Sequence, residues 1–155
     1  MQVDIRDNVP ELRIASVSHV GPYNTIGAAF GRLSQISGGA GLAKPGAALV
    51  GVYHDDPRQT PAEQLRSDAG IVVPEGASVP AELNESRVAG GRYAVALHEG
   101  SYETLPNTWK QLMEEWFPKS GKRPAGTSPA YEYYLNTPMD TPPDQLRTEI
   151  RIPIA

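Results

Sequence analysis

The sequence predicts an α+β domain in which one strand–helix–strand–strand module occurs twice, with the helices packed on an antiparallel sheet. An internal repeat, two-residue alternation in the predicted strands, and a content of 15 glycines and 15 prolines support this prediction. So many turn residues favour short elements joined by tight turns. We therefore expect a single domain over residues 1–155, with internal repeats at about 3–74 and 84–155 related by pseudo-two-fold symmetry.

The repeat consists of three blocks that recur in the same order. The shift is 79 positions in the first block, from residue 13 to 92, and 81 in the others, from residue 60 to 141. The second copy therefore carries two extra residues between these blocks. Chance seldom produces three ordered matches, so the chain is predicted to be a duplication. The matching blocks are residues 13–23 with 92–102, 52–57 with 133–138, and 60–68 with 141–149.

Each copy begins with an alternating β-rich run that ends at a Gly-x-Tyr turn, and a helical pattern follows. In the second copy we expect Thr104 to be the N-cap, Pro106 to lie near the first helical turn, and Pro118 to stop the helix. Apolar residues at helical spacing predict one buried stripe per helix. The stripe comprises Ile26, Phe30 and Leu33 in the first copy, and Leu105, Trp109, Leu112 and Trp116 in the second.

A β-hairpin is predicted at the end of each copy, with arms at residues 49–55 and 65–73, or 131–136 and 146–154. Residues 74–80 form a short linker, so we expect the halves to pack together. The last strand alternates strictly, which predicts one buried face and one wet face. The buried face comprises Leu146, Thr148, Ile150, Ile152 and Ile154, and the wet face Arg147, Glu149 and Arg151.

Composition narrows the classes of function. The formal net charge of −4 argues against direct nucleic acid binding, which usually needs a basic surface. The absence of cysteine, of a secretory signal and of a long apolar run predicts a cytoplasmic protein with no membrane association. Neither a phosphate-binding glycine loop nor metal-ligand spacing among His19, His54 and His98 is present, so we expect no cofactor and no metal.

The duplication also suggests where a ligand site lies, because a site can break the symmetry that the fold requires. Glu132 takes the place of Gly51 in the middle of an aromatic strand, where glutamate is unfavourable. Alternation puts Glu132 and Tyr134 on one face, and the corresponding first-copy pair is Gly51 and Tyr53. The two tyrosines and the carboxylate suit a flat cationic or polar molecule. The alternative is an exposed glutamate on the wet face.

The tryptophans and the recurring residues are interpreted in the same way. Trp109 and Trp116 align with Phe30 and Ser37, so Trp116 is the stronger symmetry break and the better pocket candidate. Helical stripes are more often core than ligand site, which remains the alternative for both tryptophans. The Gly-x-Tyr tyrosines recur in both copies and are interpreted as structural.

Five segments together resemble the GyrI-like proteins, a family that includes gyrase-inhibitory proteins of the SbmC type and the effector-binding domains of AraC- and MerR-type multidrug regulators. The resemblance implies two strand–helix–strand–strand modules with a pocket between them for amphipathic, often cationic compounds. It also implies that Glu132 is the electrostatic anchor. No helix-turn-helix segment is expected. The resembling segments are residues 20–23, 52–57, 60–68, 91–95 and 131–136.

Three functions follow from the resemblance and stay open. The first is a free-standing protein that sequesters or senses small amphipathic or cationic aromatic molecules. The second is a hydrolase that opens cyclopropane-bearing DNA-alkylating toxins, with Glu132 as general acid or base and therefore as the catalytic residue. The third is a protein modulator with DNA gyrase as its partner.

Overall fold

Four antiparallel strands and one helical segment make up each of two units in the computed structural model, which describes residues 1–44 and 46–155. Contacts assign residues 10–90 to one unit, here the first unit, and residues 1–9 with 91–155 to the other, here the second unit. Apart from one extra strand, which comes last in the first unit and first in the second, both units follow the order strand–helix–strand–strand, which confirms the predicted α+β class and the duplicated module.

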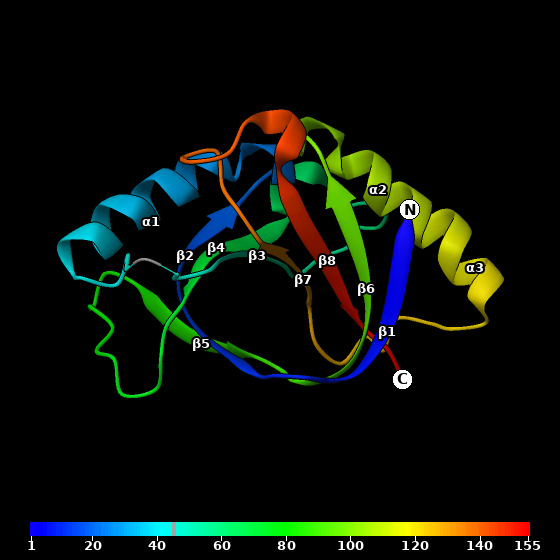
Figure 1. Cartoon of the computed structure of the whole chain (residues 1–155), viewed down its shortest axis with the longest axis horizontal. Helices are drawn as coiled ribbons and strands as arrows, with labels where there is room; N and C mark the ends of the chain where they lie inside the picture. The colour runs from blue at the N-terminus through cyan, green and yellow to red at the C-terminus, as the bar shows by residue number, and fades with distance from the viewer. Residues whose placement is uncertain (45) are drawn as a thin grey trace. The chain divides into compact units, whose positions relative to one another are not determined.

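In the first unit a helix covers one face of strands ordered β3-β4-β2-β5. Figure 1 shows this helix along the strands of the first unit. Its Ala29 and Leu33 pack with Ala15, Ala69 and Ile71 from the strands. The predicted apolar stripe therefore forms this core, with Ile26 and Phe30 partly buried against it. The elements are β2 (Leu12–Val20), α1 (Gly27–Gly39), β3 (Leu49–Tyr53), β4 (Arg66–Val72) and β5 (Asn84–Val88).

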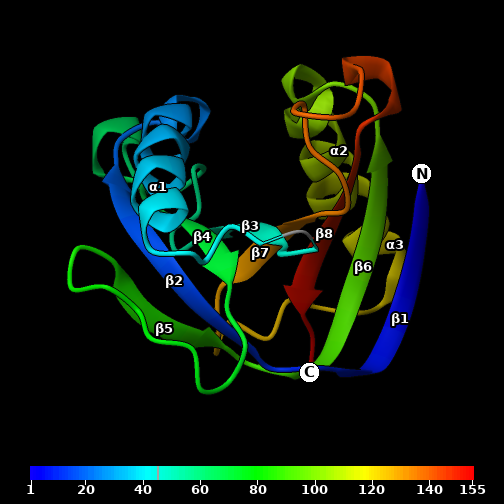
Figure 2. The ribbon, with the colours of Figure 1, turned by 60° about the vertical axis from the view of Figure 1, so that its left-hand side comes forward.

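The second unit has the equivalent order β7-β8-β6-β1, with β7 in the place of β3 and the edge strand β1 in the place of β5. Figure 2 shows its helical segment along one face of the strands, where Leu112 and Phe117 pack with Ala96, Ile150 and Ile152. A π-helical turn (Leu112–Trp116) joins the two α-helical parts of this segment. The elements are β1 (Gln2–Val9), β6 (Gly91–Glu99), α2 (Leu105–Gln111), α3 (Phe117–Ser120), β7 (Ala130–Tyr134) and β8 (Arg147–Pro153).

The two edge strands β1 and β5 were not among the strands expected from the sequence. β1 pairs with β6 of the later copy, and β5 pairs with β2 of the earlier copy. Each unit thus takes its outermost strand from the part of the chain that lies beyond its own repeat. The expected hairpin arms agree with β3, β4, β7 and β8 to within two residues at each end.

The Gly-x-Tyr turns have the same geometry in both units. Gly21 and Gly100 have φ angles of +134° and +123°, which residues with a side chain rarely adopt. The amide of Gly21 donates to the carbonyl of Leu65 at 2.8 Å, and the amide of Gly100 to that of Leu146 at 2.7 Å. These recurring glycines therefore fix the turn between the end of each strand and the helical segment that follows it.

The end and the start of the second helix differ from the prediction. Pro118 does not stop the helix, which continues to Ser120 and ends at Gly121 with a φ of +73°. The π-helical turn explains this, because it makes Pro118 an early residue of α3, where a missing amide hydrogen is tolerated. Thr104 is at the N-cap position, but its hydroxyl donates to the carbonyl of Ser101 instead of capping the helix.

The face of β8 that was expected to be wet is largely buried. Thr148, Ile150 and Ile152 are buried on the helix side, as predicted. On the other side, the side chains of Glu149 and Arg151 are only 10% and 11% exposed. Glu149 accepts from Arg151 at 2.7 Å and from Arg6 of β1 at 2.9 Å. The ion pairs between these side chains offset the cost of burying their charges. The alternating sequence pattern does not reveal such pairs.

Candidate functional site

Glu132 lies in the middle of β7, on the face that the helical segment covers. Alternation along β7 places Ala130, Glu132 and Tyr134 on this side and Tyr131 on the other. Tyr131 is fully buried, and its ring packs at 5.7 Å from that of Tyr93. Glu132 itself is only 4% exposed, so the alternative of a solvent-exposed glutamate is wrong.

Both carboxylate oxygens of Glu132 accept short hydrogen bonds. The indole Nε1 of Trp109, on α2, donates to Oε2 at 2.7 Å. The hydroxyl of Tyr134, two residues along β7, donates to Oε1 at 2.7 Å. Hydrogen bonds to a charged group contribute about 1.5–3 kcal/mol each, so these two donors help to offset the cost of burying the carboxylate.

Tyr102 adds a second phenol ring to this group. It lies in the 3₁₀ turn Tyr102–Thr104, and its ring centroid is 5.4 Å from that of Tyr134. Burial and the nearby charge of Glu132 raise the pKa of Tyr102 to about 12, so the phenol stays protonated at neutral pH. The second unit therefore holds one carboxylate beside an indole and two phenols.

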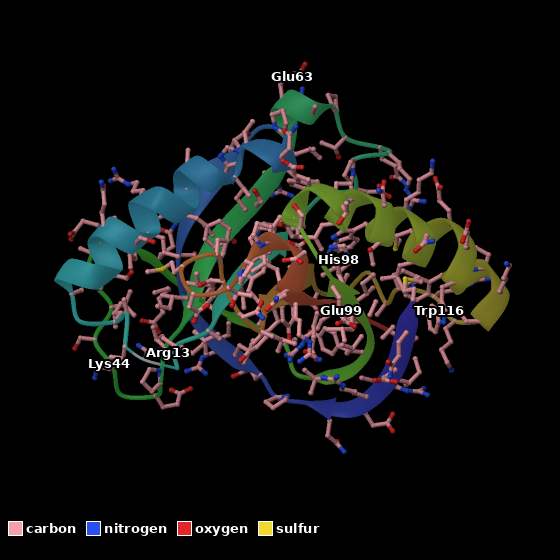
Figure 3. All side chains as sticks on the ribbon, turned by 45° about the horizontal axis from the view of Figure 1, so that its top comes forward. Arg13, Lys44, Glu63, His98, Glu99 and Trp116 are labelled. Carbon is pink, nitrogen blue, oxygen red and sulfur yellow. The ribbon has the colours of Figure 1, made fainter. Side chains whose placement is uncertain are left out.

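Of the residues predicted from the sequence, Glu132, Tyr134 and Trp109 are brought into direct contact. The ring centroids of Trp116 and Phe117 are 4.9 Å apart, and Trp116 packs at the edge of the second unit's core (Figure 3). Trp109, which we ranked below Trp116, is thus the tryptophan bonded to Glu132. Tyr102 was interpreted as structural, and the sequence contained no signal of its closeness to Glu132.

Gly51 and Tyr53 lie on β3 of the first unit. Gly51 is buried opposite Ala69, and the ring of Tyr53 packs at 4.7 Å from that of Tyr23. This tyrosine pair is the first unit's equivalent of Tyr102 and Tyr134. The hydroxyl of Tyr23 donates to the carbonyl of Asp55 at 2.7 Å, which fixes the end of the hairpin arm.

The recurring histidines make local structural contacts. Nε2 of His19 is 2.8 Å from the hydroxyl of Thr25, and Nε2 of His98 is 3.2 Å from that of Thr104. His98 also bonds through Nδ1 to the hydroxyl of Thr108 at 2.7 Å, next to Trp109 on α2. Among the described residues, no three histidine or carboxylate side chains are grouped as metal ligands.

The family model for the GyrI-like small-molecule-binding domain matches residues 1–155. A DNA gyrase inhibitor of Yersinia enterocolitica is 32% identical over 129 residues, covering 80% of each chain. A prophage-derived putative transcriptional regulator of Bacillus subtilis, YosT, is 30% identical over 120 residues, covering 74% of this chain and 77% of that protein.

Solved structures share the fold at low sequence identity. The EcmrR chain in its DNA complex matches with a TM-score of 0.78 and 19% identity over 99% of this chain, which spans 57% of that longer chain. SAV2435, solved with bound tetraphenylphosphonium, matches with a TM-score of 0.70 and 15% identity over all of this chain and 94% of that one. No helix in the described part of this chain is both long and apolar enough to cross a membrane.

Proposed function

Because the chain belongs to the family of GyrI-like small-molecule-binding domains, we propose that its ligands are amphipathic cations or cationic aromatic compounds held at Glu132. The observation that carries the proposal is the buried Glu132 carboxylate, which Trp109 and Tyr134 hold at 2.7 Å each. Their donated hydrogen bonds fix the carboxylate among aromatic rings.

The physical argument combines charge with aromatic stacking. A cation near a desolvated carboxylate gains more Coulomb energy than it would in water. Each of the rings of Trp109, Tyr102 and Tyr134 can add about 0.5–2 kcal/mol when a cation or a flat ring lies against it. The tetraphenylphosphonium bound to SAV2435, a protein of the same fold, is a ligand with both properties.

The test is a titration with tetraphenylphosphonium, in which binding is measured by calorimetry and by tryptophan fluorescence. We expect Glu132→Gln to weaken binding at least tenfold, because the amide keeps an acceptor for Trp109 but loses the charge. Trp109→Phe is expected to weaken binding several-fold. The matched controls are Glu115→Gln, an exposed helical glutamate, and Trp116→Phe, and both should bind within about twofold of the parent.

Unchanged affinity in Glu132→Gln would refute the site assignment, provided that circular dichroism shows an intact fold. Equal losses in Trp109→Phe and Trp116→Phe would refute the specific role of Trp109. Both results are independent of which compound the chain binds most tightly, because tetraphenylphosphonium serves as a probe of charge and aromaticity.

The hydrogen bond from Tyr134 to Glu132 favours hydrolysis as a second candidate function. The pair could deliver a proton while water attacks a strained electrophile such as a cyclopropane-bearing DNA alkylator. The net reaction adds one water molecule to the toxin and opens the ring. Mass spectrometry would detect this mass increase with the parent chain and its loss in Glu132→Gln; unchanged toxin would exclude the reaction.

The names of the relatives make DNA gyrase a further candidate partner, since the matched Yersinia protein is called a DNA gyrase inhibitor. A supercoiling assay with purified gyrase tests this directly. Inhibition that survives Glu132→Gln would point to a protein interface, and inhibition that requires the cationic ligand would link the two functions. No effect at stoichiometric excess would remove gyrase as a partner.

A further inference from the structure

A cavity of about 240 Å³ lies on the second unit's sheet, on the face opposite to the helical segment and Glu132. Val95 and Leu97 of β6 and Leu135, just after β7, provide its apolar lining. Leu135 is 43% exposed. Arg147 of β8 and Asp4 of β1 are among the charged residues around it.

Comparison of the two copies shows how Arg147 becomes available. In the first unit, Asp55 accepts from the amide of Arg66 at 2.8 Å and also pairs with its guanidinium at 2.9 and 3.1 Å. At the equivalent place Asn136 accepts from the amide of Arg147 at 2.7 Å. The backbone contact is kept, but within the described chain the guanidinium of Arg147 has no hydrogen-bond or ion-pair partner.

A second difference leaves space at the same position. In the first unit His54 pairs with Asp68 at 2.6 Å. Their equivalents are Leu135, which cannot pair, and Glu149, which is bonded to Arg6 and Arg151 instead. The Asp55–Arg66 ion pair and the His54–Asp68 contact of the first unit are therefore both missing from the second unit, and the cavity is found there.

We propose that this cavity is a second ligand site, which binds a small organic monocarboxylate with an apolar body. The planar guanidinium of Arg147 suits a carboxylate, with which it can form two parallel hydrogen bonds. Leu97 and Leu135 provide an apolar surface for the rest of the ligand, above the nearly buried Val95. The volume limits the ligand to a size below that of typical drug-like molecules.

The other charges at the cavity favour a single negative charge. Glu149 is already neutralised by Arg6 and Arg151, so it repels the ligand little. Asp4 lies at the exposed rim and is not neutralised by any described residue, so it opposes anions that carry two or more charges. This proposal does not depend on the cation site at Glu132, because the two sites are on opposite faces of the sheet.

The test is an NMR titration of the full chain with octanoate, with acetate and octylammonium as comparison probes. We expect octanoate to shift the signals of Leu97, Leu135 and the Arg147 side chain. Acetate should bind at least tenfold more weakly because it lacks the apolar body, and octylammonium should not shift the Arg147 signal. The octanoate shifts should persist in Glu132→Gln, which separates this site from the proposed cation site.

Two variants address the role of Arg147, with a matched control for the first. Arg147→Gln should weaken octanoate binding at least tenfold, and Arg66→Gln, the same change in the first unit, should leave it unchanged. Asn136→Asp restores the first unit's ion pair, so the new carboxylate should occupy the guanidinium and weaken octanoate binding while the fold stays intact. Binding that is insensitive to Arg147→Gln and Asn136→Asp, or octanoate shifts away from these residues, would overturn the proposal.

Discussion

The prediction that follows most directly from the geometry concerns the buried Glu149 and its two arginines. Glu149→Gln keeps the shape of the side chain but removes the charge that neutralises Arg151, whose side chain is only 11% exposed. Removing one partner of a buried ion pair costs about 3–5 kcal/mol of unfolding free energy. We expect about 2–3 kcal/mol, because Arg6 is 42% exposed and can be rehydrated. In the variant, Arg151 also keeps the hydrogen bond that it donates to the hydroxyl of Tyr131 at 3.1 Å.

Urea denaturation measures this change. With a slope of about 2 kcal/mol per molar urea, the midpoint should fall by about 1–1.5 M. Glu85→Gln is the matched control, because Glu85 also accepts two hydrogen bonds from one arginine, Arg13, but is 48% exposed. This control should lose much less stability than Glu149→Gln, because exposed ion pairs contribute little. Equal losses in the two variants would refute the argument that burial sets the size of the effect.

The lowered pKa of Glu149 predicts how the stability of the fold depends on pH. Burial alone would raise the pKa of Glu149, but hydrogen bonds from Arg6 and Arg151 outweigh burial and hold its pKa below the usual value. The contribution of Glu149 to stability is therefore present above the unfolded-state pKa and is lost as the pH falls through the lowered folded-state pKa. Glu149→Gln should lose less stability on acidification than the parent; an equal acid dependence in both would contradict this assignment.

Three further predictions concern other parts of the fold. Tyr102→Phe should remove a phenol whose pKa, like that of Tyr93, is raised to about 12. An alkaline titration of tyrosinate absorbance would detect this loss as a smaller late transition. Tyr23→Phe should lower the melting temperature by a few degrees, about 1 kcal/mol, because its hydroxyl bonds both the carbonyl and the amide of Asp55; an unchanged melt would contradict this. Gly100→Ala should destabilise the chain by about 1–2 kcal/mol in urea, since its φ is +123°.

The parts of the fold that depend on local pattern were predictable from the sequence. Alternation correctly placed Glu132 with Tyr134, because successive residues of a strand point to opposite faces. The edge strands β1 and β5 were not predicted, because each pairs with a segment more than 60 residues away. The wet face assigned to Glu149 failed because the arginine that buries it, Arg6, is on a distant strand.

The candidate site could be predicted in part. The repeat identified Glu132, but spacing along the helix could not tell which tryptophan reaches it. That depends on how α2 packs against β7, which is a tertiary property. The π-helical turn Leu112–Trp116 changes the phase of the helix, yet Trp109 before it and Trp116 at its end both pack against the second unit's core, as the predicted stripe requires.

The duplication works as an internal control for separating structure from ligand recognition. Where both copies keep a residue, as with Gly21 and Gly100, the backbone geometry is also the same, so the fold accounts for the residue. The change from Asp55 to Asn136 is different in kind. It preserves the hydrogen bond to the next strand's amide, at 2.8 and 2.7 Å, yet it removes the charge that holds the partner arginine. Arg147 is exposed, so its guanidinium can be hydrated without a protein partner and is available to a bound carboxylate.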